Sequence, residues 1–156
     1  MTTKPTTLAM TISEVIENLT LMIVDEPKTH EGFAPQLRGQ IEFTGPVNGV
    51  LSIECSEILS QKLAVNLLGT EQETLETQAD ALDALGELLN VVCGNLVTSL
   101  YDSNRPFNLL SPKVDNIGPE LSDDNKKQNH SDDDSQKAFM LLDGEPVEFT
   151  LSIKKI

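Results

Sequence analysis

Four residues in the middle of the chain combine chemical groups and a spacing that could support a reaction or a docking contact. They are Asp83, Glu87, Asn90 and Gly94, separated by four, three and four positions. An α-helix turns by about 100° per residue, so this spacing places all four on one face. Two carboxylates and a carboxamide would therefore point outward together. A solvent-exposed helix face can show the same pattern, and the spacing alone leaves both interpretations open.

Asn90 and Gly94 favour a functional face over an ordinary solvent-exposed one. A short carboxamide competes for backbone hydrogen bonds inside a helix, and glycine there costs roughly 1 kcal/mol relative to alanine. Neither residue favours the helix. Gly94, one turn after Asn90, would leave bare backbone beside the polar groups. We interpret the row as a face that another macromolecule approaches closely.

The helix that carries this row is expected to be the longest in the chain. From about Leu75 to Tyr101 the sequence has no proline and only two glycines. Its apolar residues fall within one arc that must face the core, and this arc turns the polar row toward solvent. The arc consists of Leu82, Leu85, Leu89, Val92, Cys93, Leu96 and Leu100.

Two helices and a hairpin are expected before this helix. Apolar residues at helical spacing predict an amphipathic helix from about Thr11 to Ile23, with Glu14 completing a capping box at its start. The runs Leu37–Thr44 and Gly49–Cys55 predict an antiparallel hairpin. A second helix should run from its cap at Ser56 to a stop at Gly69.

Strands are expected after the long helix. Residues Phe107–Ile117 are predicted as a strand, with Pro112 at an edge or a bulge because proline has no backbone N–H to donate. The run Ala138–Leu142, a turn at Asp143 and Gly144, and an alternating run through Ile153 predict a closing hairpin.

The order of these elements predicts an α+β fold in which helices cover one face of an antiparallel β-sheet. A chain of 156 residues matches the size of one domain, so we expect a single domain over residues 1–156. Residues 118–136 lose nearly all apolar side chains and carry runs of aspartate, which predicts a mobile acidic loop within this domain.

Charge and composition argue against two classes of partner. The 25 acidic and 11 basic residues give a net charge of −14, which repels nucleic acids and anionic membranes. The amino terminus lacks the apolar core of a signal peptide, so a cytoplasmic location is expected. Cys55 and Cys93 lie apart from each other and from any histidine cluster, so we predict buried apolar side chains and no metal site.

The segment that contains Asp83, Glu87 and Asn90 resembles the signature of a known family. The segment Asp83–Asn95 reads DALGELLNVVCGN and is similar to the signature D/S-x-x-x-E-x-x-N of the CheX/CheC/FliY chemotaxis phosphatases. The order of helices and hairpins along most of the chain resembles that family as well. Pro112 follows Asn90 by 22 positions, one fewer than the family pattern has. The signature occurs once, which resembles CheX more than the two-site members.

The resemblance implies a phosphatase that hydrolyses the phospho-aspartate of a CheY-like response-regulator receiver domain. It implies that Glu87 and Asn90 are catalytic, with Asn90 orienting the attacking water and Glu87 meeting a lysine of the receiver. Asp83, Glu87 and Gly94 would bind the receiver, and the sequence leaves open a second interpretation of Asp83 as only a solvated carboxylate. Mg²⁺ is expected in the receiver, with no cofactor or metal in this chain. Single-site members pair as homodimers by joining sheets, and the regular strand Val147–Ile156 could supply such an edge.

Two other functions remain open from the sequence. A non-catalytic module could use the same face to sense or sequester a phosphorylated receiver. An acidic scaffold without a receiver partner would require the spacing of Asp83, Glu87 and Asn90 to be accidental. The presence of both Glu87 and Asn90 favours catalysis.

Overall fold

The computed structural model describes residues 4–20, 22–26, 33–68, 77–100, 106–117 and 134–154. The helices are α1 (Lys4–Leu19), α2 (Glu57–Leu68) and α3 (Thr77–Leu100). The strands are β1 (Val24–Asp25), β2 (Leu37–Thr44), β3 (Asn48–Cys55), β4 (Asn108–Leu109), β5 (Lys113–Asn116), β6 (Asp134–Leu142) and β7 (Glu145–Lys154).

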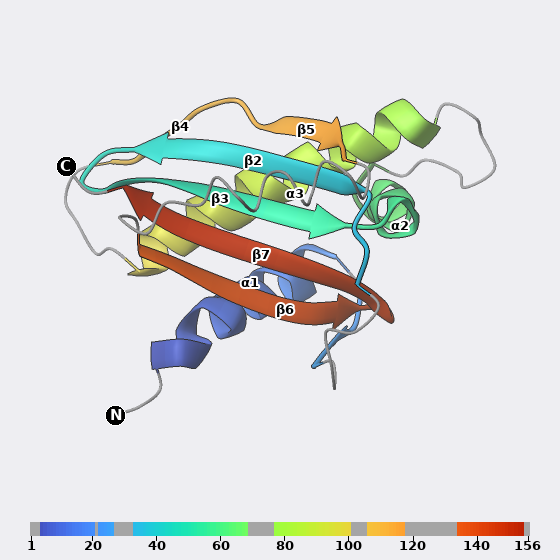
Figure 1. The fold of residues 1–156 in the computed structure, drawn as a ribbon, viewed down its shortest axis with the longest axis horizontal. Coiled ribbons are helices and arrows are strands. Elements are labelled where there is room, and N and C mark those ends of the chain that lie inside the picture. Colours follow the sequence, from blue (N-terminus) through green and yellow to red (C-terminus); the bar gives the residue numbers. More distant parts are fainter. Residues whose placement is uncertain are drawn as a thin grey trace.

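All these strands belong to one antiparallel sheet with the order β1-β6-β7-β3-β2-β4. Strand β5 also pairs with β2, so β4 and β5 follow one another along the same edge of the sheet. The helices α1 and α3 lie across one face of the sheet, and α2 packs beside α3 (Figure 1). The prediction of an α+β fold with helices on one face of an antiparallel sheet is confirmed.

The core lies between this face and the helices. Along β2, the residues with the parity of Leu37, Ile41 and Phe43 are buried, and those between them are partly or fully exposed. Strands β3 and β7 show the same alternation, and Phe149 of β7 is fully buried. Period-two burial is what a sheet with one covered face requires.

Both predicted hairpins are present. Strands β2 and β3 pair from Phe43↔Gly49 to Leu37↔Cys55. Strands β6 and β7 join through Asp143 and Gly144, whose φ angles of 50° and 84° suit a tight two-residue turn. The carboxylate of Asp143 also accepts a hydrogen bond from the backbone N–H of Ile23 at 2.8 Å, which ties the turn to the segment before β1.

The first helix begins and ends earlier than its periodicity predicts. It starts at Lys4, so Thr11 and Glu14 lie inside the helix and do not cap it. It ends at Leu19 because the Thr20 hydroxyl donates to the carbonyl of Ile16 at 2.9 Å and accepts from the N–H of Met22 at 3.0 Å. These local bonds compete with further helical bonds and turn the chain toward β1.

The second helix has the predicted start. The N–H of Leu59 donates to the hydroxyl of Ser56 at 3.1 Å, which is the geometry of an N-cap. The predicted stop at Gly69 lies outside the described residues. By length and hydropathy alone, Ala81–Ser99 of α3 would qualify as a membrane span, but its packing between the sheet and α2 is that of a core helix.

Three expectations for the later strands need correction. The single strand Phe107–Ile117 is two short strands, β4 and β5, with Pro112 in the break between them. The acidic loop cannot extend to Gln136, because β6 begins at Asp134; residues 118–133 lie outside the described part. Strand β7 is not an edge, since β6 pairs with one side of it and β3 with the other.

Two glycine-to-alanine substitutions should change stability in opposite directions. A Cβ at Gly49 would lie 2.5 Å from the carbonyl oxygen of Ser152 and 2.6 Å from the ring of Phe43, so Gly49→Ala should lower the free energy of unfolding by about 1–3 kcal/mol. A Cβ at Gly94 would lie 3.6 Å from Leu109, an ordinary contact, so Gly94→Ala should raise it by up to about 1 kcal/mol. Chemical denaturation measures both, and changes of the same sign would contradict this packing.

Candidate functional site

The rotation of α3 about its axis is fixed by its apolar side. This side contacts α1, α2, β2 and β3. Its fully buried members are Ala84, Leu85, Leu88, Leu89, Val92, Cys93 and Leu96. The predicted core-facing arc is thus present, except that Leu82 is only half-buried and the side chain of Leu100 is not described.

The predicted polar row lies on the opposite side of α3. Asp83, Glu87 and Asn90 are exposed, and Glu87 and Asn90 are about one helical turn apart. Gly94 differs from them, because it is half-buried beside the side chain of Leu109. The structure therefore brings the two carboxylates and the carboxamide together and places Gly94 against β4.

The three polar residues border a surface groove of about 630 Å³. One wall is α3, which contributes Leu82, Asp83, Gly86, Glu87 and Asn90. The other wall is the β4–β5 segment, which contributes Leu109, Leu110, Ser111, Pro112 and Val114. In Figure 1 this segment follows β2 at the edge of the sheet, with α3 crossing behind it. The motif residues thus face a second element that comes later in the chain.

Gly86 allows the two walls to approach closely at the base of the groove. It is buried, and a Cβ built on it would lie 3.4 Å from Cγ of Pro112 and 4.0 Å from Cγ2 of Val114. A larger side chain would push the walls apart. Pro112 therefore lies at the groove despite its one-residue shorter spacing from Asn90, and Gly86 is a groove residue that the sequence analysis did not single out.

The β4–β5 wall is held in place by β2 on both sides of its break. Phe43 of β2 pairs with Leu109, and Gln40 pairs with Lys113. Between these pairs, the N–H of Leu110 donates to the carbonyl of Glu42 at 2.9 Å. The wall is therefore a fixed surface and not a free loop.

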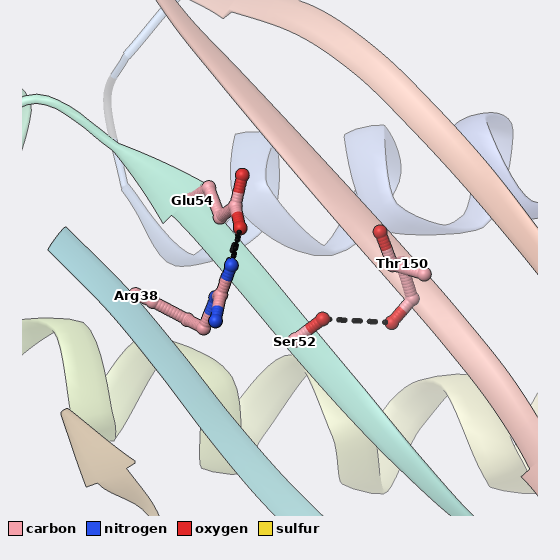
Figure 2. A network of polar contacts seen from close by, with 4 residues as sticks. All are labelled: Arg38, Ser52, Glu54 and Thr150. Atoms are coloured by element: carbon pink, nitrogen blue, oxygen red, sulfur yellow. Dashed lines mark hydrogen bonds and ion pairs between the residues drawn. The ribbon is translucent and has the colours of Figure 1, made fainter. Parts of the chain in front are cut away.

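The charge of the groove is entirely acidic. Asp83 and Glu87 are the only charged residues among the ten described residues that line it. The shortest ion pair among the described residues lies outside the groove: Arg38 donates to Glu54 through Nε at 2.9 Å and Nη2 at 2.6 Å. Figure 2 shows this pair, with the Ser52–Thr150 hydrogen bond, on the face of the sheet away from the helices. The groove carboxylates therefore remain available to a cationic group of a partner.

The cysteines do not contribute to this site. Cys55 and Cys93 are buried, and burial raises the pKa of each thiol to about 12. Both would be neutral and unreactive at physiological pH, in line with the prediction of buried apolar side chains. Within the described ranges, no group of three or more His, Cys, Asp or Glu side chains is arranged to hold a metal ion.

The comparison with known proteins identifies the family of this chain. Residues 37–139 match the profile of the family described as chemotaxis phosphatase CheX. The chain belongs to the CheX family. A comparison with curated protein sequences finds no match.

Several solved structures share the fold of this chain at low sequence identity. A chain of the CheX–CheY–BeF3–Mg²⁺ complex from Borrelia burgdorferi has a TM-score of 0.72 and 22% identity, covering 97% of both chains. CheX from Desulfovibrio desulfuricans has a TM-score of 0.68 and 15% identity, covering 97% of this chain and 98% of its own. FliY from Thermotoga maritima has a TM-score of 0.54 and 16% identity, and the match covers 94% of this chain and 82% of the FliY chain.

Proposed function

We propose that this protein hydrolyses the phospho-aspartate of a CheY-like receiver domain, in the cytoplasm. The observation that carries the proposal is the exposure of Glu87 and Asn90 side by side at the mouth of a groove. Membership of a family of chemotaxis phosphatases supports it. The Borrelia burgdorferi complex contains CheX, CheY, Mg²⁺ and BeF3, a group that stands in for a phosphoryl group. We infer the same class of partner for this chain.

The reaction needs positioning more than covalent assistance. A water oxygen attacks phosphorus in line, the bond between phosphorus and the aspartate oxygen breaks, and free phosphate and an aspartate carboxylate result. The transition state is loose, so rate is gained chiefly by holding the water in line and neutralising charge. Mg²⁺ enters with the receiver as part of the substrate. No metal of this chain is required.

Asn90 suits the role of water orientation. A carboxamide is uncharged and cannot act as a general base at neutral pH, but it can accept one hydrogen bond and donate another. Both bonds can fix the water with a lone pair toward phosphorus. Because Asn90 is exposed on a helix whose opposite side is buried in the core, its amide can enter the receiver site without rearrangement of the core.

Glu87 and Asp83 suit a docking role. Glu87 lies one turn before Asn90 on the same face, so a receiver lysine paired with Glu87 would hold Asn90 in register with the phosphoryl group. Asp83, one turn further back, adds to the negative potential of the groove. We propose that Gly94, which lies beside β4, allows the receiver backbone to approach the end of this row.

Asn90→Ala should reduce stimulated dephosphorylation by about 10²-fold or more, because one positioned polar group is lost from the transition state. The measurement is the decay of phosphorylated CheY-like receivers from the same organism, with and without the protein. Asn95→Ala is the matched control: Asn95 is an exposed amide on α3 that donates to the carbonyl of Val91 at 2.9 Å. If Asn90→Ala retains the wild-type rate, Asn90 does not orient the water. If the wild-type protein binds receivers without accelerating decay, it is a sequestering module.

Glu87→Ala should weaken binding to a BeF3-loaded receiver by about threefold to tenfold, because an interfacial ion pair is lost. Salt should weaken wild-type binding more steeply than binding of the variant. Glu17→Ala removes one exposed carboxylate from α1 and controls for the net charge of −14. Equal salt slopes in all three proteins, with unchanged affinity, would transfer the docking role to Asp83.

We also propose a homodimer that joins sheets at β6. Among the described strands, β1 is the one that pairs with the outer side of β6, and it reaches Leu141 and Leu142 alone. The two-residue turn between β6 and β7 fixes which residues of β6 form hydrogen bonds with β7. In this register, alternate residues of β6 such as Ser135 and Lys137 have backbone N–H groups that point away from β7. In the described part of the chain, no strand pairs with the outer side of β6 at Ser135 and Lys137, so a second copy can add a strand there.

Lys137→Pro should convert the dimer to a monomer, because it removes one edge N–H without interrupting the β6–β7 ladder. Sedimentation equilibrium measures the change in mass. Lys137→Ala keeps the N–H and should remain dimeric. A dimer in Lys137→Pro with wild-type affinity would show that the copies join elsewhere.

A further inference from the structure

Leu110 is a large apolar side chain left open to solvent at the groove. It is 45% exposed, although its N–H is bonded to β2 and its neighbours Leu109 and Lys113 pair with that strand. Its backbone is therefore fixed, and its side chain is presented without a partner inside the described structure. A fixed, exposed leucine at a functional groove indicates a contact surface.

The two walls of the groove differ in chemistry. On α3, Asp83, Glu87 and Asn90 provide charge and hydrogen bonds. The β4–β5 wall is mainly apolar, with Leu109, Leu110, Pro112 and Val114 as its apolar members. A partner that fills the groove must therefore present a polar or cationic group toward α3 and an apolar side chain toward β4–β5.

The size of the groove requires more than the reacting groups. It measures about 630 Å³, whereas a water molecule occupies about 30 Å³ and a phosphoryl group is of similar scale. The water and the phosphoryl group beside Asn90 would leave most of the space open. Side chains next to the phospho-aspartate must fill the remainder if water is to be excluded from the interface.

We propose that Leu110 is a docking anchor that packs against an apolar side chain of the receiver domain, next to its phospho-aspartate. This inference rests on the proposed function and adds a specificity-determining residue to it. Glu87 selects for a cation on one side of the phosphoryl group, and Leu110 selects for an apolar side chain on the other. A receiver with an acidic side chain at that place would be rejected, because its charge would be buried against apolar side chains in a groove whose charged described residues are Asp83 and Glu87.

The position of the groove favours a receiver over a second copy of this chain as the occupant. The groove lies at the β4–β5 edge of the sheet, and the open part of β6 lies at the opposite edge. A dimer joined at β6 therefore leaves the groove uncovered. Leu110 also borders the same groove as Asn90, so a receiver that delivers its phosphoryl group to Asn90 brings its neighbouring surface to Leu110.

The test compares Leu110→Ser with Leu110→Met and with Ile58→Ser. The probe is a CheY-like receiver loaded with BeF3 and Mg²⁺. Leu110→Ser should raise Kd about tenfold, and Leu110→Met should restore nearly wild-type affinity, because the contact depends on apolar area. Ile58, on α2 and outside the groove, is 55% exposed, so Ile58→Ser should leave Kd unchanged. Chemical denaturation confirms that each variant is folded.

Kinetics and salt separate this role from that of the catalytic pair. With phosphorylated receiver, Leu110→Ser should raise KM about tenfold and change kcat by less than about twofold. The ratio of its Kd to the wild-type Kd should stay constant between about 0.05 and about 0.5 M salt, because an apolar contact is not screened.

The outcomes distinguish this inference from the proposed function. An unchanged Kd in Leu110→Ser, with turnover that still depends on Asn90, overturns the docking role and leaves the phosphatase. Suppose instead that Leu110→Ser raises Kd tenfold and that the wild-type protein does not accelerate dephosphorylation. This pair of results supports the docking role and overturns catalysis. A change in self-association with unchanged receiver affinity would make a second copy the occupant and overturn the inference.

Discussion

The rotational setting of α3 is the constraint on which the site depends. Leu85, Leu89 and Val92 are completely buried on one side of the helix, while Glu87 and Asn90 are exposed on the other. Turning the helix by one residue would bring several buried side chains to solvent, at about 1.5–3 kcal/mol for each. The same apolar packing that stabilises the fold thus directs the reactive groups outward.

A second surface completes the site and belongs to the edge of the sheet. Strand β2 uses its inner edge to pair with β3 and its outer edge to hold β4 and β5. The break at 110–112 leaves Leu110 and Pro112 facing α3 across the groove. Gly86 lets this edge lie close to the helix. Chemistry and docking therefore come from two elements that the sheet places at a fixed separation.

Much of this arrangement could be predicted from sequence because local patterns determine it. Helical periodicity identified the outward row on α3, and Ser56 was identified as a cap from local chemistry. The partners of a strand depend on residues far away in the sequence. The alternation along β7 therefore cannot show that β3 pairs with one of its edges and β6 with the other. For the same reason, Leu110 looked like one residue of an ordinary strand. Its exposure follows from pairing with β2 and from the position of α3.

The most direct test of the central claim is a crystal structure of the protein bound to a receiver loaded with BeF3 and Mg²⁺. The account predicts that α3 lies over the receiver site and that the Asn90 carboxamide is within about 3 Å of the position in line with the aspartate–beryllium bond. It also predicts that Glu87 contacts a receiver lysine. A complex in which the receiver contacts another face of the protein, with Asn90 open to solvent, would contradict the account.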